Sequence, residues 1–222
     1  MSAGTPLRLA ILISGRGSNM TAITRACLAG ELNARVELVI SDRAEAAGLA
    51  GARDLGADTA TVLRAPGMSI ADFEHELAAR IDAARPEAIA LAGFMRILSP
   101  PFVERYLGRM LNIHPALLPA YRGLHTHRRV LTDKAAEHGA SVHFVTAELD
   151  AGPVVLQSKV AVRPADTEAT LAARVMATEH VIYPRVLGWF AQQRLKWHHG
   201  AAWLDGTRLD APIVEDFRAT AV

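Results

Sequence analysis

Two side chains suited to catalysis stand close together near the middle of the sequence. Asn112 and His114 lie two residues apart in LNIHPALLP, residues 111–119, and on an extended strand they project from the same face. An Asn amide is a neutral donor and an imidazole a titratable one, so together they suit oxyanion stabilisation and proton transfer. The alternative is a buried histidine whose hydrogen bonds are satisfied in the core and which has no catalytic role. The polar pair, followed by two prolines, favours acyl-type or proton-transfer chemistry.

A carboxylate that would complete such a site is Asp150, in the polar segment ELDAGP, residues 148–153. An Asp before Gly-Pro is usually a turn former. Placed beside a histidine, the same carboxylate would orient the imidazole and favour its protonated form. The sequence leaves both roles open.

A glycine-containing turn follows the first apolar run, in SGRGSN, residues 14–19. The backbone N–H groups at the start of the next helix can hold an anion, and Ser18 and Asn19 add side-chain donors. A nicotinamide-cofactor fingerprint would need a third glycine where Met20 stands, and the P-loop Lys-Ser/Thr pair is absent. An ordinary strand–helix turn is the alternative. The pattern favours a phosphate-bearing ligand without naming it.

Two further segments have weaker signals. Five histidines between residues 114 and 143 raise the question of zinc, but no cysteine lies nearby and no HExxH motif occurs. His125 and His127 could present two ligands on one side of a strand, but the segment between them is typical of a loop and the start of a helix. We therefore expect no metal. The segment AGFMRIL, residues 92–98, suits a flat, partly anionic ligand or, equally, a core stretch with a solvated Arg96.

The elements that must position these residues alternate between strand-like and helix-like runs. Short, continuous apolar runs are typical of parallel strands that are covered on both faces. Helix-like runs rich in Ala, Leu and Glu separate them, which indicates a parallel sheet with helices on both faces. The predicted strands are residues 7–14, 35–41, 58–63, 87–92 and 109–114, and the clearest helix spans residues 69–86.

After about residue 140 the pattern changes. Residues 140–162 predict two strands joined by a turn around residues 150–153, as an antiparallel pair at the sheet edge. Residues 167–189 predict a long helix in which Pro184 implies a break or kink. An Asp205-Gly206 turn joins strand-like pieces near the C-terminus. No linker or repeat is visible, so we expect one domain, residues 1–222, with an α/β, Rossmann-like, mostly parallel sheet.

Composition narrows the class of protein. The 222 residues have a net charge of +1 and 5% aromatic residues, which disfavours nucleic acid or an anionic membrane as partner. The single cysteine, Cys27, excludes an internal disulfide and suits a reducing compartment. The N-terminus resembles a first strand rather than a signal peptide, and no apolar run reaches the roughly 20 residues that span a bilayer. We expect a soluble, cytoplasmic protein that is a monomer or homodimer.

Taken together, these segments resemble the phosphoribosylglycinamide formyltransferases, or glycinamide ribonucleotide transformylases, of purine biosynthesis. The resemblance runs from end to end and covers residues 12–19, 91–100, 111–119, 123–131, 138–154 and 201–206. It implies transfer of a formyl group from 10-formyltetrahydrofolate to the amine of N1-(5-phospho-D-ribosyl)glycinamide, on the route to IMP. No metal is implied.

The resemblance also implies site residues. The catalytic group would be Asn112, His114 and Asp150. The ribonucleotide would bind at Gly17, Ser18, Asn19, Pro115, Met176, Ala177, Thr178 and Glu179, with Glu179 at the ribose. The folate would bind at Met95, Arg96, Ile97, Leu98, Asn112, Thr146, Ala147, Glu148, Leu149 and Asp150.

Two departures from the family pattern are visible. Ile70 stands where relatives have an Arg that is thought to meet the glutamate tail of the folate, which leaves Arg96 as the nearby candidate. Arg122 replaces a residue that is more usually Pro or Lys in the loop after the active site. Neither departure touches the expected chemistry.

Related and unrelated alternatives make different demands on the sequence. A methionyl-tRNA formyltransferase would add a C-terminal RNA-binding domain, and a formyltetrahydrofolate deformylase a domain before the first strand, so length favours the purine enzyme. A silent phosphate- or folate-binding module would be expected to lack one of the three catalytic residues. A nicotinamide-dependent oxidoreductase is disfavoured by Met20 and by the position of Asp42, which follows Gly15 by 27 residues in the sequence where the fingerprint expects an acidic residue after about 20.

Overall fold

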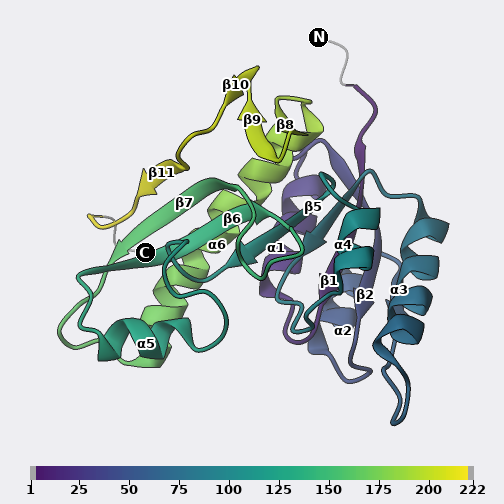
Figure 1. Cartoon of the computed structure of the whole chain (residues 1–222), viewed down its shortest axis with the longest axis horizontal. Coiled ribbons are helices and arrows are strands. Elements are labelled where there is room, and N and C mark those ends of the chain that lie inside the picture. The colour runs from purple at the N-terminus through teal and green to yellow at the C-terminus, as the bar shows by residue number, and fades with distance from the viewer. Residues whose placement is uncertain (1–3, 220–222) are drawn as a thin grey trace.

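A twisted eight-stranded sheet forms the centre of the structure (Figure 1), a computed structural model that describes residues 4–219. Its strands are β1 (Leu7–Ile13), β2 (Ala34–Ser41), β3 (Thr59–Thr61), β4 (Ala88–Leu91), β5 (Met110–His114), β6 (Glu137–Phe144), β7 (Val154–Ala161) and β11 (Ile213–Asp216). They lie in the order β11-β7-β6-β5-β4-β1-β2-β3. Strands β1 to β5 are parallel, β6 runs antiparallel to β5 and β7, and β11 is parallel to β7.

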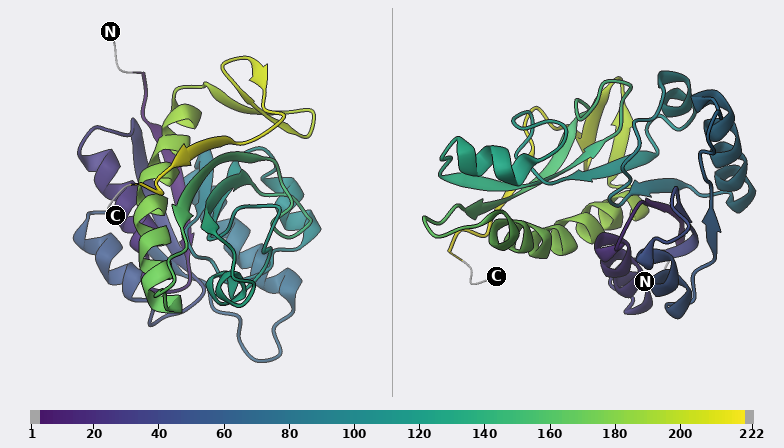
Figure 2. Two further views of the ribbon diagram at one scale, coloured as in Figure 1. Left: turned by 90° about the vertical axis from the view of Figure 1, so that its left-hand side faces the viewer. Right: turned by 90° about the horizontal axis from the view of Figure 1, so that it is seen from below.

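Helices cover both faces of this sheet (Figure 2). They are α1 (Ser18–Leu28), α2 (Ala47–Asp54), α3 (Ile70–Ala84), α4 (Pro100–Arg105), α5 (Thr126–Thr132) and α6 (Glu168–Ala191). In β1, Leu9 and Ile11 pack into the core beneath α1, α2 and α6, whereas Leu12 packs into the core beneath α3 and α4. Because both faces of β1 are buried, its sequence is apolar at every position except the exposed Arg8, as expected for a parallel strand.

The structure confirms the α/β class and the antiparallel pair, β6 and β7, near the C-terminal edge. It adds β11 outside that pair, so β7 is not the edge strand. The Asp205-Gly206 turn joins β9 (Ala201–Leu204) to β10 (Thr207–Arg208), and with β8 (Leu195–His198) they make a separate three-stranded sheet, at the top of Figure 1.

Helix α6 differs from expectation, because it continues without a break through Pro184. Four side chains around the proline, Ile182, Tyr183, Val186 and Leu187, are fully buried. Burial of each contributes about 1.5–3 kcal/mol, which together exceeds the roughly 3 kcal/mol that proline costs inside a helix. Tyr183 also donates to the carbonyl of Leu111, at 2.9 Å, and so ties α6 to β5.

Across residues 4–219, none of the helices has the length and apolar character needed to cross a bilayer.

Candidate active site

The three side chains expected to do chemistry meet at the C-terminal end of β5. His114 Nδ1 lies 3.4 Å from Asp150 Oδ2. Asn112 Nδ2 lies 3.1 Å from Nε2 of a fourth residue, His143, which is itself 3.8 Å from Asp150 Oδ1. His114, His143 and the Asp150 carboxylate are all nearly buried. The carboxylate thus lies between two imidazoles, in the position where open α/β sheets place their ligands.

Strand pairing and a tight turn bring these groups together. In the β5–β6 ladder Asn112 is paired directly with His143, so their side chains are neighbours on one face. Asp150 lies in the turn between β6 and β7 and has a positive φ of 50°, which is uncommon for a residue with a side chain. Gly152 lets that turn close: a Cβ there would lie 1.8 Å from the carbonyl oxygen of Phe144.

The loop after β5 contacts both His114 and Asp150. His114 Nε2 lies 2.9 Å from the carbonyl oxygen of Tyr121. The backbone N–H of Gly123 donates to Asp150 Oδ2 at 2.9 Å. Both ring nitrogens of His114 therefore face oxygen acceptors, an arrangement that a doubly protonated imidazole satisfies.

A cavity of about 100 Å³ opens beside these groups. Besides Asn112, His143 and Asp150 it is lined by Leu91, Phe94, Arg96, Ile97, Leu98, Val103, Val145, Thr146, Ala147 and Leu149. The structure thus brings most of the expected folate-binding residues around one space. Two of them lie outside its wall: Met95 is 58% exposed, and Glu148 points to solvent, where it pairs with Arg122.

The expected ribonucleotide residues gather where α1 meets α6. Helix α1 begins after Gly17, which has a φ of +72°, and no side chain caps its first turn. Its first N–H groups therefore remain open to an anion. Asn19 Nδ2 donates to Glu179 Oε2 at 2.7 Å, and Ser18 Oγ lies 3.4 Å from Met176 Sδ. Burial raises the pKa of the Glu179 carboxyl, which the Asn19 hydrogen bond opposes.

Three other residues expected to bind the ribonucleotide, Thr178, Ala177 and Pro115, are buried or half-buried. Thr178 is fully buried, and its hydroxyl lies 2.7 Å from that of Ser158 and bonds the Val175 carbonyl. Its side chain therefore belongs to the packing of α6 on the sheet. Ala177 is half-buried on α6, and Pro115 is half-buried directly after β5.

Sequence reasoning missed His143 as a member of the site. The residue was visible only as one histidine of a cluster, and its place beside Asn112 depends on the register of two strands that are distant in sequence. Tyr121 was missed for a different reason, because it contributes a backbone carbonyl.

Two of the remaining histidines of that cluster, His127 and His138, contact each other. His127 Nδ1 lies 2.9 Å from His138 Nε2. His125 and Thr126 begin α5, which confirms that this segment is a helix start rather than a strand. Over the described range, 4–219, no group of three or more His, Cys, Asp or Glu side chains is arranged to hold a metal ion.

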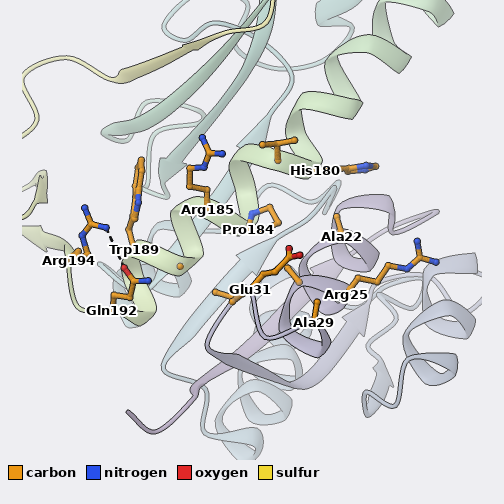
Figure 3. Close-up of a pocket in the computed structure, with 14 residues that line it drawn as sticks. Ala22, Arg25, Ala29, Glu31, His180, Pro184, Arg185, Trp189, Gln192 and Arg194 are labelled. Carbon is orange, nitrogen blue, oxygen red and sulfur yellow. Dashed lines mark hydrogen bonds between the residues drawn. The ribbon is translucent and has the colours of Figure 1, made fainter. Parts of the chain in front are cut away.

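A wider groove, of about 560 Å³, lies elsewhere, between the C-terminal halves of α1 and α6 (Figure 3). Arg185 and Arg194 on its wall are engaged with Glu215 and Asp205. The groove lacks a donor–acid pair like that at β5, so we do not assign the chemistry to it.

The buried histidines predict how stability depends on pH. Burial lowers the pKa of His143 to about 4 and that of His138 to about 3. Between these values and about 6.5 the unfolded chain binds protons that the folded chain does not. We therefore expect the free energy of unfolding to fall as pH decreases from 6.5 to 4, on the order of 3 kcal/mol per histidine.

Urea unfolding at several pH values checks this prediction. The variant His138→Gln should show a shallower loss of stability between pH 6.5 and 4 than the parent, whatever its stability at pH 7. Equal slopes for the two proteins would contradict it.

Residues 7–187 match the family model described as formyl transferase. The chain is 52% identical to the phosphoribosylglycinamide formyltransferase of Escherichia coli (strain K12), over 91% of this chain and 96% of that protein. It resembles the solved phosphoribosylglycinamide formyltransferase of Coxiella burnetii with a TM-score of 0.90 and 47% identity, covering 94% and 99% of the two chains.

A solved formyltetrahydrofolate deformylase from Pseudomonas syringae is also similar in fold. Its TM-score is 0.83 at 22% identity, and the match covers 91% of this chain and 67% of that one. At that identity the likeness concerns the fold alone.

Proposed function

The chain belongs to the formyl transferase family, and we propose that it transfers the formyl group of 10-formyltetrahydrofolate to the amine of N1-(5-phospho-D-ribosyl)glycinamide in purine biosynthesis. One observation carries the proposal: Asn112, His114 and Asp150 meet beside a cavity lined by the expected folate residues. The 52% identity to a phosphoribosylglycinamide formyltransferase over nearly the whole chain supports it.

Attack of the amine on the formyl carbon creates a tetrahedral intermediate with a negative oxygen and a positive nitrogen. The amide of Asn112 and the protonated ring of His114 are the two donors that stabilise this oxygen. An ionised Asp150 beside the ring stabilises the imidazolium. The amine then loses a proton by way of water held at Asp150, the folate nitrogen gains one, and the bond between formyl carbon and folate nitrogen breaks.

For His114 to reach the formyl oxygen, its Nε2–H must leave the carbonyl of Tyr121, 2.9 Å away. The loop that contains Tyr121 also binds Asp150 through Gly123. We therefore place a loop displacement before the chemical step, with the substrate oxygen taking the place of the Tyr121 carbonyl.

The ribonucleotide binds at the other half of the site in this proposal. Its phosphate lies on the open N–H groups after Gly17, and its ribose lies near Glu179, which Asn19 holds in place. The phosphate is thereby bound away from the reacting carbon, so substrate affinity and the chemical step depend on different residues.

We place the folate tail at a pair of arginines, Arg64 and Arg96. A hollow of about 470 Å³ is lined by Arg64, residues 65–69 and Arg96. Arg96 is bound to the buried Asp42, with Nε 2.7 Å from Oδ2, whereas Arg64 has no ion pair within residues 4–219. We infer that Arg64 compensates for Ile70 in contacting the carboxylates of a polyglutamate tail.

This assignment predicts a modest, tail-specific effect. Arg64→Ala should raise the KM for a polyglutamylated formyl donor about 3- to 5-fold, because exposed ion pairs are worth up to about 1 kcal/mol. The KM for a donor without a glutamate tail should not change, and Ile70→Arg should lower the KM for the polyglutamylated donor. Initial rates with the two donors measure this, and an equal effect on both would contradict the assignment.

The expected partners, oligomeric state and location of the protein complete the proposal. We expect small-molecule substrates rather than nucleic acid, a monomer or homodimer, and a cytoplasmic location, since the lone Cys27 permits no internal disulfide. The decisive experiment follows tetrahydrofolate formation spectroscopically with the ribonucleotide present or omitted. Acceptor-dependent turnover supports the proposal, whereas equal turnover without acceptor would indicate a deformylase.

A further inference from the structure

His143 lies next to Asn112 without being one of the expected catalytic residues. Its Nδ1 is 2.9 Å from the carbonyl oxygen of Phe144. A carbonyl only accepts hydrogen bonds, so Nδ1 must be the protonated nitrogen. In the neutral ring, Nε2 is then an acceptor.

The neighbour of that acceptor is the Asn112 amide, with Nδ2 3.1 Å from Nε2. A lone pair on Nε2 attracts the NH₂ group of the amide and repels its carbonyl oxygen. The amide therefore has one favoured orientation, in which one N–H donates to His143 and the second N–H is available to the cavity that both residues line. The flipped amide would turn an oxygen, not a donor, towards the formyl oxygen.

A competing arrangement would have His143 protonated on both nitrogens and paired with Asp150. The distances disfavour it: Asp150 Oδ1 is 3.8 Å from Nε2, beyond hydrogen-bond range, while the Asn112 amide is within it. Burial also disfavours the charged ring and lowers its pKa to about 4. His114, on the same carboxylate, is a further cationic neighbour that opposes a second charge.

We propose that His143 is a positioning residue for formyl transfer, which fixes the Asn112 amide with an N–H directed at the formyl oxygen. The inference rests on the proposed function, in which Asn112 stabilises the oxyanion. His143 itself need not touch either substrate. Losing the orientation cannot cost more than losing the donor, for which about 10²–10³ in turnover is typical. We expect a loss of about 10- to 100-fold in kcat, with little change in either KM.

Two substitutions of similar size separate positioning from packing. In His143→Gln the side-chain carbonyl reaches the place of Nε2 and can accept from Asn112, so kcat should stay within about 3-fold of the parent. In His143→Asn the shorter amide reaches only the place of Nδ1, so the bond to Phe144 is kept and that to Asn112 is lost. This variant should show the kcat loss.

The test is a double-mutant cycle with steady-state kinetics of Asn112→Ala, His143→Asn and the double variant, together with His143→Gln. We expect His143→Asn to lower kcat in the parent but to have no further effect in the Asn112→Ala background. An equal loss in both backgrounds, or a Gln variant as impaired as the Asn variant, would overturn the inference. Full activity of Asn112→Ala would overturn its role as an oxyanion donor and with it the inference, whereas acceptor-independent turnover of the parent would overturn the proposed function itself.

Discussion

Removing any one of the three grouped side chains is expected to lower turnover by about two orders of magnitude or more. The changes are Asn112→Ala, His114→Ala and Asp150→Asn. In the proposed mechanism Asn112 and His114 provide the donors to the developing oxyanion, and loss of one such donor typically costs about 10²–10³ in turnover. Asp150 acts on the imidazole across 3.4 Å and on the proton transfer.

The losses should not add. The three groups act on one intermediate, so once one is missing the others have less to stabilise, and the triple variant should be only slightly slower than the slowest single variant. Affinity for the ribonucleotide should survive in all of them, because its phosphate is placed at the start of α1. Single-turnover rates and equilibrium binding of the ribonucleotide measure the two parts separately.

The neutral replacement Asp150→Asn is a matched control for geometry. It keeps an acceptor for the Gly123 N–H, which lies 2.9 Å from the carboxylate, and removes only the charge. A His114→Ala protein with near-normal turnover would sink the mechanism, and an undiminished Asp150→Asn protein would remove the carboxylate from it.

How much of this site could be read from the sequence depends on the range of the contacts. That Asn112 and His114 share a face follows from the two-residue period of a strand, which is a local property. That His114 meets Asp150 depends on the β6–β7 turn, and that Asn112 meets His143 depends on the β5–β6 register. These contacts join residues 36 and 31 positions apart, so no local pattern in the chain encodes them.

The fold likewise combines elements that local sequence predicts with elements that depend on long-range contacts. Strand β1 was predictable because burial on both faces makes its sequence apolar at all positions but Arg8. Strand β11, with the sequence IVED, was not predictable. It pairs with β7 through the backbone, and its side chains alternate between half-buried and exposed, so it has no continuous apolar run. Helix α6 passes Pro184 because tertiary packing outweighs the local cost of proline, a balance that propensity alone does not contain.

The structure determines which substitution best tests the proposed phosphate site. A valine at Gly17 would obstruct the phosphate, but its Cβ would also lie 2.9 Å from the Cα of Gly48 in a backbone of positive φ. Such a variant is strained whether or not a ligand binds there. Ser18 is the better position, because it is the first residue of α1 and is half-buried at the open helix end.

Ser18→Asp is expected to raise the KM for the ribonucleotide about 10²-fold. A carboxylate there repels the phosphate and competes for the same N–H groups, and charge-assisted hydrogen bonds are worth about 1.5–3 kcal/mol. The free energy of unfolding should instead rise slightly, by roughly 0.5 kcal/mol, because a negative charge at a helix N-terminus is stabilising. The KM for the folate should barely change, since the folate cavity lies beside Asn112.

Ser18→Asn is the control, since it has nearly the size of Asp and no charge. We expect its KM for the ribonucleotide to stay within about 3-fold of the parent, because a neutral amide still offers a donor to the phosphate. Initial-rate kinetics on both substrates and urea unfolding of both variants provide the measurements. If the Asp and Asn variants raise this KM equally, bulk rather than charge is responsible, and the phosphate does not lie at the start of α1. An anion site at this helix end requires the opposite combination in Ser18→Asp, namely a higher free energy of unfolding together with weaker ribonucleotide binding.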